Sequence, residues 1–233
     1  MVRSKQSYRD SAGKTFEDYP RPSVAVDTAV LSVVEDRLSV LLTLTNEAAR
    51  GKTAERWRLP GTFLHEGEVL ADAVRRSLKE KAGVEGLLPR QLQVFDDPAR
   101  DDRGWVLSVA HVAAVRADRI PLTDRTRLVP VAEVGDLQYD HEVIIDYAAE
   151  DLRDSYRRLP DPGRLVADSW EGEPADSFTI LELRRVHEAV LGERFNRDTF
   201  RRSMLPSLVA TGQWRKGARG KPAELYVRTM VKA

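Results

Sequence analysis

The stretch that decides the fold is residues 59–84, LPGTFLHEGEVLADAVRRSLKEKAGV. Its Pro60-Gly61 pair ends a short strand that we expect at 57–60. Apolar residues then return at helical spacing over 69–82, and Gly83 follows as a stop signal. The stretch therefore predicts a strand end, a loop and a helix of about four turns.

The segments on either side predict more strands and a second helix. Runs rich in β-branched residues indicate strands at 23–34, 38–45, 92–95 and 105–115, with a polar loop at 46–55. An apolar stripe predicts a helix over 141–159, with Asp140 as its N-cap. This order of elements is typical of an α/β or α+β fold.

The last third of the chain has a different pattern. Residues 160–175 are rich in proline, glycine and acidic residues, which is typical of a domain boundary. A helix is expected to begin at Ser177 or Thr179 and to end at Gly192, and a second helix follows at about 197–208. The basic, glycine-punctuated segment 213–220 then separates two strands. Together these features predict a winged helix-turn-helix.

The composition excludes several classes of protein. The 233 residues are 42% hydrophobic and include 14 glycines and 12 prolines, so the chain is neither wholly disordered nor fibrous. No apolar run reaches the roughly 18 residues of a membrane span, and the polar residues 1–20 lack a secretory signal. The absence of cysteine excludes disulfides, thiolate zinc sites and cysteine nucleophiles. We therefore expect a cytoplasmic protein without a membrane partner.

Charge is distributed unevenly along the chain. The 37 basic and 37 acidic side chains cancel, but residues 194–233 contain ten basic residues and two acidic ones. Such a density of positive charge suits a polyanionic partner such as nucleic acid. The alternative is a basic face that serves only solubility.

The quoted stretch resembles the Nudix box, G-x5-E-x7-R-E-U-x-E-E-x-G-U with U aliphatic. It aligns without a gap: Thr62 replaces the first glycine, while Glu68, Arg76 and Gly83 are retained. In that family the loop and helix present carboxylates that hold divalent cations, which polarise a pyrophosphate for attack by water.

The sequence departs from the Nudix box at two of the positions whose carboxylates bind the metal ion. Of the three glutamates in R-E-U-x-E-E, only Glu80 remains, because Ser77 and Lys81 replace the other two. A charged lysine has no lone pair for magnesium. We therefore predict no metal site, weak or absent Mg²⁺ binding, and no catalytic residues.

The whole chain resembles the NrtR family of Nudix-related transcriptional regulators over about 200 residues. The landmarks are DDRGW at 101–105, DHE at 140–142, FRR at 200–202 and GKPAELY at 220–226. This resemblance implies a Nudix-type α/β/α sandwich with a mixed sheet, followed by a winged helix-turn-helix domain. It also implies a bacterial homodimer, with no required cofactor, that senses ADP-ribose or a related NAD metabolite and binds double-stranded operator DNA of NAD-biosynthesis genes.

The expected boundaries are a flexible arm at 1–20, a Nudix-like ligand-sensing domain at 21–157 and a winged-helix domain at 158–233. In the Nudix-like domain, arginines are expected to contact the diphosphate of the ligand, and aromatic side chains are expected to stack on its adenine. The ligand-binding candidates are Arg56, Arg58, Gly61, Thr62, Phe63, Glu68, Glu80, Arg103 and Trp105.

Each of these roles has an alternative. Trp105 is as suited to the core as to a ligand site, and Arg58 is suited to flanking a strand edge. Glu68 and Glu80 would either hold one ion weakly or pair with Arg76.

In the winged-helix domain, the arginines of the second helix lie within two turns of one another, so they are positioned to reach phosphates or guanine edges in the major groove. Basic residues of the wing suit contacts to the DNA backbone. The DNA-binding candidates are Arg197, Thr199, Arg201, Arg202, Arg215, Lys216, Arg219 and Lys221. The alternative is that Phe200 and Leu205 face the core and the arginines form a solvated face.

Two functions follow from this sequence. The first is a ligand-responsive repressor. The second is a Mg²⁺-dependent hydrolase of ADP-ribose or similar pyrophosphates, motivated by the retained Glu68 and Glu80. An RNA-binding module is disfavoured, because no aromatic-studded sheet accompanies the basic segment. The four histidines are scattered and are interpreted as structural.

Overall fold

The computed structural model describes residues 8–49, 52–135, 137–216 and 221–229. Its larger sheet has seven strands in the order β3-β2-β1-β6-β5, with β4 paired to β1 and β7 paired to β2. β1 and β6 run parallel and the other pairs are antiparallel, so the sheet is mixed. The strands are β1 Ser23–Val34, β2 Arg37–Ala49, β3 Lys52–Arg58, β4 Gly61–Phe63, β5 Arg90–Phe95, β6 Val106–Ala114 and β7 Thr126–Pro130.

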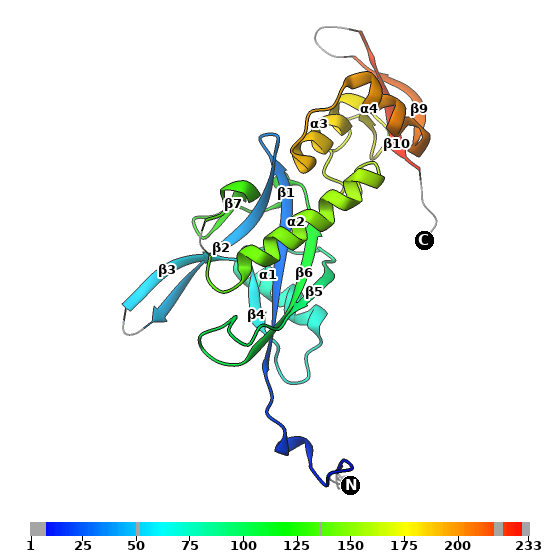
Figure 1. Ribbon diagram of the computed structural model, residues 1–233. Coiled ribbons are helices and arrows are strands. Elements are labelled where there is room, and N and C mark those ends of the chain that lie inside the picture. The colour runs from blue at the N-terminus through cyan, green and yellow to red at the C-terminus, as the bar shows by residue number, and fades with distance from the viewer. Residues whose placement is uncertain (1–7, 50–51, 136, 217–220, 230–233) are drawn as a thin grey trace.

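Two helices cover the two faces of this sheet, α1 (Leu70–Ala82) and α2 (His141–Arg158). Side chains alternate along β1, as the period of a strand requires. Val26 and Val30 pack in the cluster that contains α1, whereas Ala29 and Leu31 pack in the cluster that contains α2. The predicted α/β/α sandwich is therefore confirmed, and Figure 1 shows α2 crossing the front of the sheet.

The predicted loop at 46–55 is wrong. β2 continues to Ala49 and pairs with β3 from Thr43–Arg58 to Ala49–Lys52. Ladder hydrogen bonds come from the backbone, so a polar stretch forms them as well as an apolar one once a partner strand is present. The short strands β4 and β7 were not predicted from the sequence.

Both predicted helices of the larger domain form. Gly83 ends α1 in the left-handed conformation, at φ 63°. Asp140 lies at the N-cap of α2, but its side chain makes no cap hydrogen bond. It accepts two hydrogen bonds from Arg100 instead, at 2.8 and 2.5 Å. The N-cap position was therefore predicted correctly and the role of its side chain was not.

The C-terminal domain is a winged helix. Its elements are β8 Phe178–Thr179, α3 Ile180–Leu191, α4 Arg197–Met204, β9 Leu208–Arg215 and β10 Ala223–Arg228, and the sheet order is β8-β10-β9. Thr179 and Glu182 form a capping box at the start of α3. The α-helix expected over 197–208 stops at Met204, because Pro206 lies in the 3-10 turn that follows.

Short 3-10 helices complete the chain at Phe16–Asp18, Ala117–Arg119, Val131–Glu133 and Leu205–Ser207. None of the helices in the described segments combines the length and the apolar content that a bilayer crossing requires. The N-terminal segment extends from one end of the sheet, and the winged helix lies at the opposite end (Figure 1).

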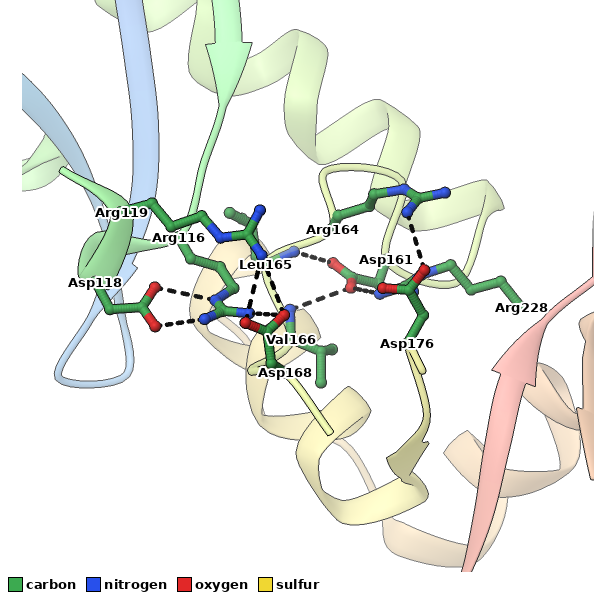
Figure 2. A network of polar contacts seen from close by, with 10 residues as sticks. All are labelled: Arg116, Asp118, Arg119, Asp161, Arg164, Leu165, Val166, Asp168, Asp176 and Arg228. Atoms are coloured by element: carbon green, nitrogen blue, oxygen red, sulfur yellow. Dashed lines mark hydrogen bonds and ion pairs between the residues drawn. The ribbon is translucent and has the colours of Figure 1, made fainter. Parts of the chain in front are cut away.

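The two domains pack directly on each other. Val186, Val190 and Leu191 of α3 contribute to the core cluster that also contains α2. The connecting segment is fixed by Asp161, which is fully buried. Its carboxylate accepts hydrogen bonds from the Leu165 and Val166 amides, and it pairs with Arg228 of β10 (Figure 2). One acidic side chain thus joins the connecting segment to the winged-helix sheet.

A second group of ion pairs anchors the same segment to the larger domain. Arg116 and Arg119, at the end of β6, both pair with Asp168 of the connecting segment (Figure 2). We therefore expect little independent motion of the two domains in this state. The boundary at 157/158 remains a prediction.

His187 of α3 is buried at this junction, between the rings of Tyr156 and Phe200 at 4.9 and 5.1 Å. Its Nε2 accepts the amide proton of Asp161 at 3.4 Å, which requires a neutral ring. Burial lowers the pKa of His187 from 6.5 to about 4.

This lowered pKa predicts a loss of stability in acid. The folded chain prefers neutral His187, so the contribution is complete above pH 6.5 and is lost as the pH falls through about 4. The loss between pH 7 and pH 4 should be about 3 kcal/mol from this group. Urea unfolding at both pH values would measure it. The His187→Gln variant should lose correspondingly less, and an unchanged pH dependence in this variant would contradict the assignment.

Candidate ligand pocket and nucleic-acid interface

A pocket opens in the larger domain at the end of the sheet where β1, β4 and β6 meet the start of α2. The structure brings five of the nine predicted ligand residues to it: Arg58, Gly61, Thr62, Phe63 and Arg103. Its other charged or polar lining residues are Asp27, Lys81, Arg100, Asp101, Tyr139 and His141. Four cationic side chains face two carboxylates there, so the lining favours an anionic ligand.

Asp27 lies at the buried base of the pocket. Its Oδ2 accepts a hydrogen bond of 2.6 Å from the Ser108 hydroxyl and lies 3.5 Å from Arg100 Nη2. Its Oδ1 lies 3.3 Å from His141 Nε2. Burial alone would raise the pKa of Asp27, but His141, Ser108 and Arg100 outweigh it and hold the pKa at about 2. Asp27 is therefore a fixed negative charge at neutral pH.

His141 links this carboxylate to Leu59, in the turn between β3 and β4. The Leu59 amide donates to His141 Nδ1 at 3.2 Å, which leaves Nε2 as the ring nitrogen that faces Asp27 Oδ1. We interpreted His141 as structural from the sequence. Its ring does join β1 and the turn between β3 and β4 to the start of α2, and it also lines the pocket.

Gly61 lies against Asp27 so closely that no other residue fits. A Cβ added to Gly61 would come within 1.9 Å of Asp27 Oδ1 and 2.9 Å of the Val26 carbonyl oxygen. The sequence indicated the Pro60-Gly61 pair only as a strand end. In the structure, glycine is required at position 61 because β4 packs directly against Asp27 there.

Arg103 forms one rim of the pocket. Its guanidinium donates to Asp101 at 2.9 and 2.7 Å and lies over the rings of Tyr139 and Phe63, at 4.8 and 5.5 Å from their centroids. In this structure Phe63 therefore stacks on a cation, whereas the sequence suggested that it would stack on an adenine.

The remaining four predicted ligand residues do not line the pocket. Arg56 and Glu80 are exposed, and Trp105 is 49% exposed, so it is not a core residue either. Glu68 accepts hydrogen bonds from Arg76 at 2.9 and 2.8 Å. These bonds hold the pKa of Glu68 at about 2. The predicted pairing of Glu68 with Arg76 is the arrangement that the structure contains.

The residues of the box do not fit the divalent cation that the Nudix reaction uses. Glu68 is engaged by Arg76, Ser77 is fully buried, and the Lys81 ammonium donates to the Gly61 carbonyl. Across the described residues, no group of three or more Asp, Glu, His or Cys side chains is arranged to hold a metal ion.

Sequence reasoning did not select Asp27, Lys81, Arg100 or Tyr139 as pocket residues. Asp27 carried a usable signal, because a lone acidic residue inside the apolar run 24–31 must find partners if it is buried. Arg100 and Tyr139 gave no such signal, since they lie in loops that only the fold brings to the pocket.

The predicted DNA-binding residues of α4 lie on different faces of that helix. Arg197, Thr199, Arg201 and Arg202 are exposed, whereas Phe200 is buried in the core of the winged helix, where the alternative interpretation placed it. Arg197 and Arg201, four residues apart, line a groove between α4 and the strands β9 and β10. Thr199 lies on the opposite side, in a pocket beside the end of α2.

The predicted wing residues also separate. Lys216 and Lys221 are exposed, and Arg219 lies outside the described residues. Arg215 differs from the expectation, since its side chain is 8% exposed, pairs with Glu173 at 2.6 Å and also with Glu182. It stacks on Trp170 at 4.3 Å as well. The prediction that Arg215 contacts DNA is therefore corrected: this last residue of β9 is nearly buried, and two carboxylates engage its charge.

Arg215 and Lys216 are expected to behave oppositely when changed to methionine. Arg215→Met leaves the nearly buried Glu173 without its partner, so stability should fall by about 2 kcal/mol. Lys216→Met should leave the unfolding free energy within about 0.5 kcal/mol of the wild-type value. It should also lower the slope of log binding constant against log salt concentration by roughly one, because one fewer phosphate contact releases counterions. Urea unfolding and salt titrations of binding measure both. Equal stability of the two variants would refute the assignment of Arg215.

Comparisons with known proteins agree with both parts of this architecture. Residues 24–150 match the family model of the NUDIX domain, and residues 175–227 match that of the NrtR DNA-binding winged helix domain. The chain is 28% identical over 218 residues to the ADPR responsive transcriptional repressor NtrR of Acinetobacter baylyi, covering 90% of this chain and 83% of the relative. It is also 30% identical over 148 residues to an ADP-ribose pyrophosphatase of Methanocaldococcus jannaschii, covering 62% and 83%.

Solved structures of a third relative extend the comparison. Shewanella oneidensis NrtR, crystallised with a 27mer DNA, superposes with a TM-score of 0.71 at 29% identity, covering 88% of this chain and 93% of that chain. The NUDIX domain of the same protein, crystallised with ADP ribose, gives a TM-score of 0.52 at 27% identity, covering 60% and 95%.

Proposed function

This chain belongs to the Nudix family and ends in an NrtR-type winged helix, and from this premise we propose that it is an ADP-ribose-responsive transcriptional repressor of NAD-biosynthesis genes. The observation that carries the proposal is that a domain whose pocket has an excess of cationic groups shares a core cluster, through α2 and α3, with a winged helix that has exposed arginines. A repressor and a DNA-bound NrtR among the similar proteins support it.

In this proposal, ADP-ribose or a related NAD metabolite binds beside Arg58, Gly61, Thr62, Phe63 and Arg103. Operator DNA binds the exposed arginines of α4 together with Lys216 and Lys221. By thermodynamic linkage, a ligand that changes the affinity for DNA must have its own affinity changed by DNA by the same factor. We propose that two copies act as a homodimer on a two-fold site. Because a repressor acts on chromosomal DNA, we propose that this protein works in the bacterial cytoplasm.

The test is a titration of the protein against its own upstream DNA by fluorescence anisotropy at moderate salt. Sequence-selective binding that ADP-ribose changes several-fold is expected. Arg202→Ala should weaken this binding, whereas Arg75→Ala, which removes an exposed arginine of α1, should not. Absence of selective binding, with or without ADP-ribose, would refute the regulator.

We also propose that the Nudix domain does not hydrolyse its ligand. The support is the loss of box carboxylates at Ser77 and Lys81 and the engagement of Glu68 by Arg76. Incubation with ADP-ribose and Mg²⁺ should release no AMP. Turnover that is lost in Glu80→Gln would instead favour the pyrophosphate hydrolase.

A further inference from the structure

Lys81 occupies a box position at which the Nudix pattern has a metal-binding glutamate. We propose that the Lys81 ammonium takes the place of the divalent cation, so that this pocket binds a diphosphate-containing nucleotide directly and without metal. The inference rests on the proposed function of the pocket and specifies how the pocket holds its anion.

The position of the ammonium supports this role. Lys81 projects from the last turn of α1 into the pocket, where its Nζ donates to the carbonyl oxygen of Gly61 on β4. A carbonyl oxygen is neutral, and in the described part of the chain Lys81 makes no ion pair with a carboxylate. Because an ammonium has three donors, two remain for an incoming anion.

Two of the other cations of the pocket, Arg100 and Arg103, are engaged by carboxylates. Arg100 is bound by Asp140 and lies near Asp27, and Arg103 is bound by Asp101. Their charges are largely balanced before a ligand arrives. Lys81 thus supplies positive charge that is not already neutralised by a direct partner.

The electrostatic surroundings of Lys81 agree with an anionic ligand. Burial lowers the pKa of its ammonium, and the charge of Arg58 lowers it further, while Asp27 and Glu80 raise it. A diphosphate placed beside the ammonium would act in the same direction as these two carboxylates. A partly desolvated ammonium also interacts with an anion more strongly than one at the surface.

The remaining box residues exclude the alternative in which a metal ion does this work. An added cation near Gly61 would meet the like charge of Lys81, and it would find Glu68 occupied by Arg76. Only Glu80 is left as an exposed box carboxylate. One carboxylate is a poor site for Mg²⁺, which takes six ligands.

The experiment is calorimetric titration of the full chain with ADP-ribose and, separately, with ADP, each in EDTA and in millimolar Mg²⁺. We expect the wild-type affinity to be the same within about twofold in the two buffers. Lys81→Met should weaken binding about tenfold or more in both buffers, because it removes a charge-assisted hydrogen bond. Lys79→Met, which removes an exposed lysine of the same helix, should change neither.

Lys81→Glu restores the carboxylate of the box and should reverse the metal dependence. Its binding should be nearly absent in EDTA and should recover in Mg²⁺. Mn²⁺ titration followed by electron paramagnetic resonance gives a readout that needs no nucleotide: Lys81→Glu should bind Mn²⁺ more tightly than the wild type. Circular dichroism of each variant checks that it is folded.

The outcomes separate this inference from the proposed function. Wild-type binding of ADP-ribose only in Mg²⁺, or unchanged affinity in folded Lys81→Met, would overturn the role of Lys81 and leave the ADP-ribose sensor intact. Metal-independent binding of ADP but not of ADP-ribose would support Lys81 and overturn the sensor. Binding of neither nucleotide would overturn both.

Discussion

Replacing Asp161 by alanine is expected to lower the free energy of unfolding by about 3–5 kcal/mol, because it leaves a largely buried cation and three buried hydrogen-bond donors without their acceptor. Asp161 is fully buried and accepts the Tyr156 hydroxyl at 2.5 Å and the Leu165 and Val166 amides at 2.7 and 3.1 Å. It also pairs with Arg228, whose side chain is 19% exposed. The alanine variant removes an acceptor from all four groups at once.

Asp176 provides a matched control for this variant. Both residues have positive φ, 50° for Asp161 and 58° for Asp176, so alanine introduces the same backbone cost at each. Asp176 pairs with Arg164 at 3.2 Å on the exposed surface, and such a pair contributes about 0–1 kcal/mol. Urea unfolding of both variants measures the difference. Equal losses would show that backbone conformation, and not the buried ion pair, stabilises the junction.

Replacing Gly61 by alanine should reduce nucleotide affinity about a hundredfold, because the new Cβ would overlap Asp27 Oδ1 at 1.9 Å. Relieving this overlap must move either the Asp27 carboxylate or the start of β4. Movement of Asp27 breaks its contacts with Ser108 and His141, and movement of β4 displaces the carbonyl to which Lys81 donates. Overpacking costs about 1–3 kcal/mol, and about 1.4 kcal/mol corresponds to tenfold in affinity.

Calorimetric titration with ADP-ribose measures this loss, and DNA binding without ligand shows whether the winged helix is still intact. Gly135→Ala is the control, because an added Cβ there meets no atom of the described residues within 4 Å. Full affinity in a folded Gly61→Ala variant would mean that the ligand does not use the arrangement of Asp27 and Gly61.

Prediction from the sequence succeeded where periodicity carried the information. The helix over 69–82 was found because its apolar residues recur every three or four positions and glycine follows it, and α1 is Leu70–Ala82. For α3 the sequence left Ser177 or Thr179 as the start and gave Gly192 as the stop, and the structure places the N-cap at Thr179 and the C-cap at Gly192. The β2–β3 ribbon was missed because its polar residues carry no alternation, although its backbone pairs through seven register positions.

For the pocket, the sequence identified the box residues and the landmark at 101–105, but it did not show how they meet. Asp27 and His141 are separated by more than 100 residues, and they touch only because β1 and the start of α2 converge beside the start of β4. The same holds for Arg215, whose inward direction depends on the strand pairing that turns it toward Glu173 and Glu182.

The sequence by itself determined the helices and the longer apolar strands, the split into a Nudix-like part and a basic winged helix, and the loss of carboxylates at Ser77 and Lys81. These properties are local: periodicity, turn residues and residue type are written in neighbouring positions. Only the tertiary structure decided that Lys81 donates to Gly61, that Asp27 lies beneath it, and that Asp161 joins the two domains. Such contacts depend on burial and on packing between distant segments, where the cost of an unpaired buried charge selects its partner.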